Sequence, residues 1–340
     1  MSAPTVSVVV PSYQRRDSLL RALGSLRRQT VPADTYEVIA AIDGSTDGTA
    51  EAVRSFEAPY ALTALEGPNR GRAAACNGGI RRAAGMVVVL LDDDMEASAG
   101  FIEAHARAHQ GPAKQAVVGA APIVVSAGSP PFVRYMAEGF AKRLERLGAP
   151  GYRLTFRDTY TGNFSAPREA FLAIGGFDEA FRVYGHEDYE LALRLQDVGV
   201  ELVYSAEALA RQHYEKTFAG FARDGIARGR TAVLFAAKHP ETVDRLKLSE
   251  YAAWPWRWRT LRGLLLAASR VSTRVPDCVI AAVEGVERLR PARLDKYYSM
   301  AIDYLYWYGA LAAFREQRAG RWAAGAPLGL DPHSRKVKGT

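Results

Sequence analysis

From the N-terminus to about residue 110, short runs of β-branched residues alternate with segments of helical periodicity. Val6–Val10 is a continuous apolar run that ends at Pro11, as expected of a strand buried on both faces. Similar runs at Glu37–Ile42 and Met86–Leu91 are separated from it by helical patterns. Strands that alternate with helices form a mainly parallel sheet with helices on both faces. We therefore expect a doubly wound α/β fold.

The later part of the chain is less regular and becomes wholly helical beyond Phe218. We expect an α/β domain over residues 1–215, with halves of about 1–110 and 111–215. A helical extension over 216–325 and a flexible tail over 326–340 would follow. The further expected strands are Ala116–Val125, Gly162–Ala166 and Val200–Tyr204, and the further expected helices are Phe132–Leu147 and Glu187–Val198.

Charge and cysteine content narrow the classes of partner. The 44 Lys and Arg residues exceed the 37 Asp and Glu residues, which gives a formal charge of +7. Such an excess favours an anionic partner: nucleic acid, an acidic membrane surface or a phosphorylated small molecule. The two cysteines exclude a disulfide scaffold and a Cys-rich metal cluster. With no signal peptide or spanning helix predicted, we expect a cytoplasmic protein.

Three consecutive acids, Asp92, Asp93 and Asp94, follow the apolar run Met86–Leu91. In open parallel sheets, ligands bind at the carboxyl ends of the strands. Like charges this close raise each other's pKa, and a hard divalent cation such as Mn²⁺ or Mg²⁺ would neutralise them. The alternative is that the acids cap the next helix and are solvated. Neither a dinucleotide glycine fingerprint nor a Gly-x-x-x-x-Gly-Lys phosphate loop is present.

Several motifs, taken together and in this order, resemble glycosyltransferase family 2, whose members are inverting GT-A enzymes that use nucleotide-sugar donors. The resemblance covers roughly residues 5–215 and implies a catalytic domain there, with a donor half followed by an acceptor half. The motifs are Val6 to Arg15, Asp43-Gly44-Ser45-Thr46-Asp47, Asn69 to Gly79, Leu91-Asp92-Asp93-Asp94, Gly162-Asn163-Phe164, Gly175 to Glu179 and Gly185-His186-Glu187-Asp188.

The resemblance assigns donor-binding roles to residues that follow the first strands. Tyr13 would stack on the base, and Pro11 would shape the turn before it. Asp43 would accept the imide N–H that uracil and thymine share, a role that is also compatible with the ring N–H of guanine. Arg15 and Arg72 would contact the diphosphate or ribose, which suits guanidinium groups. The alternative for each arginine is a solvated surface charge.

The resemblance also implies a metal site. Asp94 would ligate Mn²⁺ or Mg²⁺, and Asp93 would face the ribose or the metal. Asp92 fits an Asp-x-Asp register with Asp94, so the roles of these neighbours stay open. His213 stands where such families often add a histidine ligand, and a neutral imidazole accepts Mn²⁺. The alternative for His213 is a hydrogen-bonded structural residue.

On the acceptor side, the resemblance makes Asp188 the base that takes the proton of the attacking hydroxyl. Glu187 would orient the acceptor hydroxyls, and Asn163 and His186 belong to the same signatures. His186 would either tune this pair or simply pack. Direct displacement would invert the anomeric configuration. The alternative for the pair Glu187 and Asp188 is plain capping of the helix that follows.

The helical extension alternates tryptophan with arginine in Trp254 to Arg259, and Arg262, Arg270 and Arg274 follow. Aromatic stripes are usually core, so we expect these helices to pack on the catalytic domain or in a homo-oligomer. Such residues are also typical of membrane interfaces, so the alternative is peripheral contact with an anionic membrane at its inner face, which would suit a lipid-linked acceptor. The expected partners are a nucleotide-sugar donor and a saccharide, lipid-linked or other acceptor. A non-catalytic sugar-nucleotide-binding or scaffold protein is the second hypothesis, and nucleic-acid binding is disfavoured.

Overall fold

The computed structural model describes residues 4–111, 113–289 and 291–319. These residues form two compact units. The first takes in the chain up to Ser126, then Met136–Glu179 and Glu187–Tyr214, and the second takes in Ala127–Tyr135, Ala180–His186 and the chain from Glu215. The units therefore do not divide at residue 215 alone, because two segments from within the expected catalytic domain belong with the helical part. The expected tail, 326–340, lies outside the described residues.

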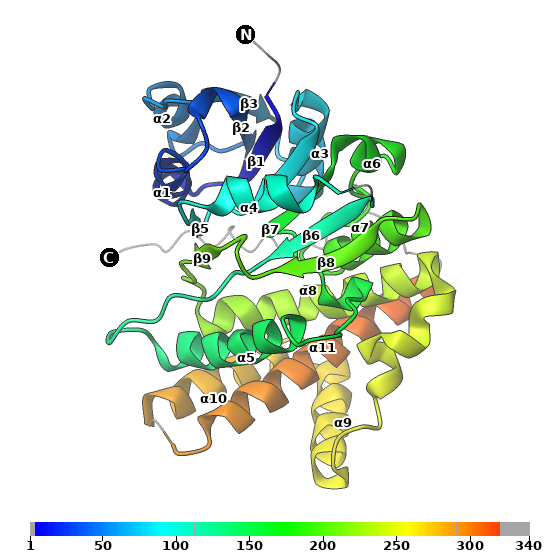
Figure 1. Cartoon of the computed structure of the whole chain (residues 1–340). Coiled ribbons are helices and arrows are strands. Elements are labelled where there is room, and N and C mark those ends of the chain that lie inside the picture. The colour runs from blue at the N-terminus through cyan, green and yellow to red at the C-terminus, as the bar shows by residue number, and fades with distance from the viewer. Residues whose placement is uncertain (1–3, 112, 290, 320–340) are drawn as a thin grey trace. The chain divides into compact units, whose positions relative to one another are not determined.

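A seven-stranded sheet with the order β3-β2-β1-β4-β7-β6-β8 forms the centre of the first unit (Figure 1). Its neighbouring strands are parallel except that β7 runs antiparallel to both β4 and β6. This confirms the expected α/β class with a mainly parallel sheet. The strands are β1 Val6–Ser12, β2 Tyr36–Asp43, β3 Ala61–Gly67, β4 Val87–Leu91, β6 Gln115–Gly119, β7 Asn163–Pro167 and β8 Glu201–Ser205.

Helices flank this sheet, and α3 packs against β1 and β2. Gly79 of α3 permits the close approach, because a Cβ there would stand 2.3 Å from Cγ1 of Val9. The α-helices are α1 Arg16–Leu26, α2 Thr49–Arg54, α3 Arg72–Arg82, α4 Phe101–Ala108, α5 Pro131–Leu147, α6 Arg168–Ala173 and α7 Glu187–Asp197, and the short 3₁₀ helices are η1 Ala33–Thr35 and η2 Phe156–Asp158.

The core of the first unit lies along the central strands, and every residue of β1, β2 and β4 is buried. The strand expected over Ala116–Val125 ends at Gly119, where a Cβ would stand 2.4 Å from the Asn163 side chain. An additional two-stranded antiparallel ribbon pairs β5 Met95–Ala97 with β9 Ala210–Gln212. Strands of three residues are too short to leave a periodic signal in the sequence.

The second unit is helical, as expected, and its longest helices, α8 and α11, pack closely on each other. A Cβ on Gly229 of α8 would stand 1.9 Å from the Tyr306 carbonyl oxygen, and one on Gly309 of α11 would stand 2.0 Å from the Ile226 carbonyl oxygen. Glycine on both helices therefore sets the crossing. The elements are α8 Phe218–Lys238, η3 Pro240–Arg245, η4 Lys247–Glu250, α9 Trp256–Val271, α10 Val275–Leu289 and α11 Leu294–Arg318.

Candidate active site

Most of the predicted site residues of the first unit gather at one edge of its sheet. The parallel strands β1, β2 and β4 end there, at Ser12, Asp43 and Leu91. The antiparallel strand β7 begins at the same edge, because Asn163 pairs with Leu91. As a result the segment before β7 meets the acids after β4.

Arg72, at the first position of α3, joins two of the predicted acids. Its Nη2 lies 2.7 Å from Oδ1 of Asp92, and its Nη1 lies 3.6 Å from Oδ1 of Asp188. Burial lowers the pKa of Arg72, but Asp92 and Asp188 raise it well above the usual value. The structure thus brings three predicted site residues into a single charged cluster: Arg72, predicted to bind the diphosphate, Asp188, the predicted base, and Asp92, one of the three acids.

Thr161 completes this cluster and was missed by sequence reasoning. Its hydroxyl donates to Oδ1 of Asp188 and accepts a hydrogen bond of 2.9 Å from Nη1 of Arg72. Gly162 allows the segment to pass close to Asp92, since a Cβ there would stand 2.5 Å from Oδ2 of Asp92. The available signal was the position of Thr161 directly before the motif Gly162-Asn163-Phe164.

The Asp188 carboxyl lies at the start of α7 with 27% of its side chain exposed. Burial raises its pKa, while Arg72 and the hydrogen bond from Thr161 oppose that rise. A carboxylate whose pKa is moved upward toward neutrality is a stronger base than a solvated one, and it remains accessible to an acceptor. The neighbouring Glu187 is buried.

Asp93 and Asp94 converge on one cationic group. Nη1 of Arg15 lies 3.3 Å from Oδ1 of Asp93 and 3.6 Å from Oδ2 of Asp94, and Ser12 Oγ donates to Oδ2 of Asp93 at 2.7 Å. Burial raises the pKa of Asp93 to about 7, although Arg15 opposes this. Two carboxylates that already share one cation form a donor set that suits a hard divalent ion.

His213 does not join these carboxylates in the structure. Its backbone N–H donates to the Asp94 carbonyl oxygen at 2.8 Å, which places it across the ribbon from Asp94. Its imidazole instead lies with Nε2 2.9 Å from Oε2 of Glu96. Among the described residues, no cluster of three or more His, Cys, Asp or Glu side chains could hold a metal ion. The backbone of His213 lies beside Asp94, as a metal ligand there would require, but its imidazole points to Glu96 instead. A metal-binding role for His213 stays a prediction.

The predicted base-binding residues lie at neighbouring strand ends. Pro11 is buried within β1, and Tyr13 follows the strand, half-buried. Asp43 ends β2 and accepts hydrogen bonds from the backbone N–H groups of Arg70 and Gly71, at 2.8 and 2.9 Å. Asp43 thus holds the segment that leads into α3. Its contact with a base stays a prediction.

Two residues expected on the acceptor side have partners inside the fold. Asn163 is fully buried, and its side chain donates to the carbonyl oxygens of Ala120 and Ala208. His186 is buried in the second unit, with Nδ1 3.0 Å from the Thr231 hydroxyl. The structure gives both side chains partners inside the fold, so they do not present themselves to an acceptor.

The family model for glycosyl transferase family 2 matches residues 7–175, and the model for the N-terminal domain of galactosyltransferase matches residues 143–218. The chain belongs to glycosyltransferase family 2. The stretch matched by the family 2 model contains Arg72, Asp92 and Thr161, and Asp188 lies in the stretch matched by the second model. Residues of several motifs that suggested this family in the sequence therefore meet at the edge of the sheet.

Over 229 residues this family 2 chain is 32% identical to the validoxylamine A glucosyltransferase of Streptomyces hygroscopicus subsp. jinggangensis (strain 5008). That alignment covers 60% of the chain and 54% of the relative, so the chain spans about half the length of this curated relative. It is also 28% identical over 240 residues to the uncharacterized glycosyltransferase YfnE of Bacillus subtilis (strain 168), covering 57% of the chain and 61% of that protein.

Among solved structures, the mannosyltransferase PcManGT from Pyrobaculum calidifontis, in complex with GDP-Man and Mn²⁺, matches with a TM-score of 0.63 at 24% identity. The match covers 93% of this chain and 89% of that one. S. aureus TarS 1-349 in complex with UDP-GlcNAc matches with a TM-score of 0.52 at 14% identity, covering 94% and 93%. These likenesses confirm the expected GT-A fold.

Proposed function

We propose that the protein transfers a sugar from a nucleotide-diphosphate donor, with UDP- or dTDP-sugars favoured, to an acceptor hydroxyl. The observation that carries the proposal is the position of Asp188. This accessible carboxylate is held by Arg72 and Thr161 at the sheet edge where the three acids follow β4. The reaction would serve the synthesis of a polysaccharide, glycolipid or other glycoconjugate.

In the proposed reaction, the acceptor oxygen bonds to the anomeric carbon as the bond from that carbon to the diphosphate breaks. Asp188 takes the acceptor proton, and we assign this to Oδ2 because Oδ1 accepts the Thr161 hydroxyl hydrogen bond. Arg72 and Arg15 stabilise the charge that develops on the departing diphosphate. A single displacement inverts the configuration at the anomeric carbon.

The carboxylates of Asp93 and Asp94 fit a divalent cation, because both already face one guanidinium. We propose that these two residues hold Mn²⁺ or Mg²⁺ with the donor, and His213 would join them only if its imidazole left Glu96. The ion would neutralise diphosphate charge. Arg15 would then turn from the acids to the donor phosphates. The Mn²⁺ recorded with GDP-Man in the Pyrobaculum protein supports this assignment.

Replacement of the base tests the proposal. Asp188→Asn removes the proton acceptor but keeps the shape of the side chain, so transfer should fall by about 10²- to 10⁴-fold. Binding of the nucleotide-sugar, measured by thermal shift across a donor panel with Mn²⁺, should change little. Asp197→Asn, at the exposed far end of the same helix α7, is the matched control. Near-normal turnover in Asp188→Asn would exclude it as the base.

Helix α9 of the second unit has a largely exposed apolar face. Trp256, Leu264 and Val271 of α9 are 68%, 65% and 91% exposed. They are seven or eight residues apart, so they share one face of the helix. Between Glu250 and Asp277 the chain has five arginines and no acidic residue. Four of these arginines are exposed, and the fifth, Arg262, is buried against Asp303. An exposed apolar stripe beside exposed positive charge fits an anionic lipid surface.

We propose that α9 holds this cytoplasmic enzyme at the inner face of a membrane. No helix among the described residues is long and apolar enough to cross a bilayer. The full chain should float with vesicles that contain phosphatidylglycerol but not with pure phosphatidylcholine vesicles. The double variant Trp256→Ala/Leu264→Ala should stay unbound. Met86→Ala, an exposed apolar position in the first unit, should float like the wild type. Wild-type protein that remains at the bottom of the gradient would refute membrane binding.

A further inference from the structure

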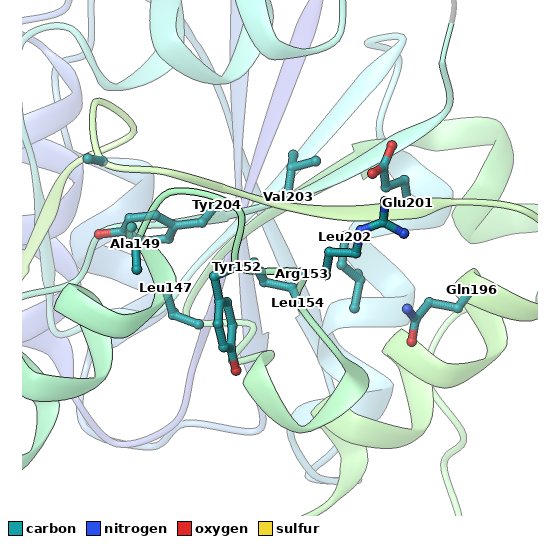
Figure 2. A pocket seen from close by; sticks show the side chains of 12 residues that line it. Leu147, Ala149, Tyr152, Arg153, Leu154, Gln196, Glu201, Leu202, Val203 and Tyr204 are labelled. Carbon is teal, nitrogen blue, oxygen red and sulfur yellow. The ribbon is translucent and has the colours of Figure 1, made fainter.

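A pocket of about 580 Å³ lies in the first unit, between β8 and the segment that follows α5 (Figure 2). Its volume is in the range of small-molecule sites. None of the residues assigned to donor binding, metal binding or proton transfer lines it. The pocket is therefore separate from the proposed active site, although both lie in the same unit.

Two tyrosines provide aromatic surface in this pocket, and Tyr152 is held in place by its hydroxyl. That hydroxyl lies 3.1 Å from both carboxylate oxygens of Asp158, which is itself buried and paired with Arg146 at 3.1 Å. In Figure 2 the hydroxyl points away from β8, so the ring rather than the polar tip faces the hollow. The second ring, Tyr204, stands on β8 and is half-buried.

Polar side chains complete the lining. Arg153 and Glu201 are the two charged residues among the described lining residues, so their formal charges cancel, and Gln196 adds an amide that can both donate and accept. Leu147 and Leu154 add apolar surface. A phosphate or a nucleotide would need a net positive site. The lining instead suits a neutral ligand that has one apolar face and a rim of hydroxyl groups.

A pyranose ring has this character, with C–H bonds on its face and hydroxyls at its edge. We propose that the pocket binds a neutral saccharide, which stacks on Tyr152 or Tyr204 and hydrogen-bonds to Arg153, Gln196 and Glu201. A peptide strand added to β8, the end strand of the sheet, is the competing occupant. The two aromatic rings and the balanced charge of the lining favour the saccharide over an extended strand.

The position of the pocket gives the saccharide a role, and this step rests on the proposed function. Gln196 and Asp188 lie on the same helix, α7, eight residues apart, which is a rise of about 12 Å along the helix axis. A short oligosaccharide spans that distance. The pocket therefore holds acceptor units remote from the hydroxyl that reacts, and it selects acceptors longer than a single sugar.

The test is binding of the full chain, without donor, to an array of neutral and anionic glycans. The wild type should bind a set of neutral glycans, and Tyr204→Ala and Gln196→Ala should each weaken that binding about tenfold or more. Tyr204→Phe, which keeps the ring, should bind nearly as the wild type does. Val198→Ala, exposed at the end of α7 outside the pocket, is the control. Thermal melting verifies that each variant is folded.

Three results would overturn the inference: no bound glycan, binding to anionic glycans alone, or glycan binding that Tyr204→Ala and Gln196→Ala leave unchanged. Capture of an extended peptide, unaffected by Tyr204→Ala, would identify the competing occupant. Donor binding measured by thermal shift should be equal in the wild type and the pocket variants. A wild type that binds glycans through the pocket but binds no nucleotide-sugar would contradict the proposed function and leave the pocket assignment standing.

Discussion

At the scale of single residues, a buried chain of hydrogen bonds links α4 to β7 through His105. The Asn163 amide nitrogen donates to two carbonyl oxygens, so its Oδ1 accepts from Nε2 of His105 at 2.9 Å. Nδ1 of His105 then accepts from the Ser165 hydroxyl at 2.8 Å, and Ser165 accepts from Nε2 of His109 at 2.8 Å. Each donor meets an acceptor only while His105 is neutral.

This arrangement makes stability depend on pH. Burial lowers the pKa of His105 from 6.5 to about 3 and that of His109 to about 4. Because the folded-state pKa is lowered, the stabilisation is fully present above pH 6.5 and is lost as the pH falls toward 3. From pH 7 to pH 5, each of the two histidines should cost about 2 kcal/mol in the free energy of unfolding.

Urea unfolding at several pH values checks this prediction. In His105→Asn, the loss of stability between pH 7 and pH 5 should be smaller by about 2 kcal/mol, whatever the absolute stability of the variant. The slope with pH is therefore the informative quantity. An unchanged slope would show that His105 already titrates normally in the folded protein.

The site residues differ in how far the sequence alone could predict their roles. The acids after β4 and the Glu187-Asp188 pair were predictable because strand ends and helix starts are visible in the pattern. The role of Asn163 was not, because the motif does not show whether a side chain at the start of a strand faces the site or the interior. The role of Thr161 depends on the antiparallel pairing of β7 with β4, which is a long-range property.

At the scale of elements, a buried charge cluster joins α9 to α11. Arg262, expected from the sequence to lie among the interfacial arginines, is fully buried, with Nη1 2.7 Å from Oδ2 of Asp303. Lys247 lies 3.1 Å from the other carboxylate oxygen, and Trp258 Nε1 donates to Oδ2 at 3.0 Å. Periodicity predicted a helix here, but it could not identify which arginine had a buried partner 41 residues away.

Removing the carboxylate should be costly, because the buried Arg262 and the half-buried Lys247 would lose their counter-ion. Asp303→Asn should lower the free energy of unfolding by about 3–5 kcal/mol, a large share of the 5–15 kcal/mol typical of a domain. Asp295→Asn, on the exposed surface of the same helix, should change it by less than about 0.5 kcal/mol. Equal urea midpoints for the two variants would mean that Asp303 does not neutralise the cluster.

At the scale of the whole molecule, the sequence predicted an α/β part followed by a helical part. It did not predict which segments of the chain belong to each of the two units. Alternation of strands and helices reveals the α/β sheet, and helical periodicity reveals the second unit. Aromatic and hydrogen-bond contacts with residues far along the chain join Ala127–Tyr135 and Ala180–His186 to the helical unit. Phe132, for example, has its ring centroid 5.6 Å from that of Phe218 and 5.2 Å from that of Tyr298.

These contacts predict that a fragment ending at Tyr214 does not keep the stability of the full chain. It would retain Phe132, which is 1% exposed in the full chain, but would lose its partners Phe218, Phe221 and Tyr298. His186 would lose Thr231 in the same way. Exposed aromatic surface of this kind promotes aggregation, so we expect a low soluble yield and a lower melting temperature.

A point variant in the full chain tests the same contacts without truncation. Phe132→Ala should reduce the free energy of unfolding by about 3–5 kcal/mol, because it empties a well-packed aromatic site. Phe314→Ala, at a position that is 38% exposed on α11, should cost clearly less. The fragment and Phe132→Ala could both have the melting temperature of the wild-type chain. The first 214 residues would then fold independently, and the division near residue 215 expected from the sequence would be the correct one. If both are destabilised, the stability of the helical unit depends on the two segments, Ala127–Tyr135 and Ala180–His186, that it takes from the stretch before residue 215.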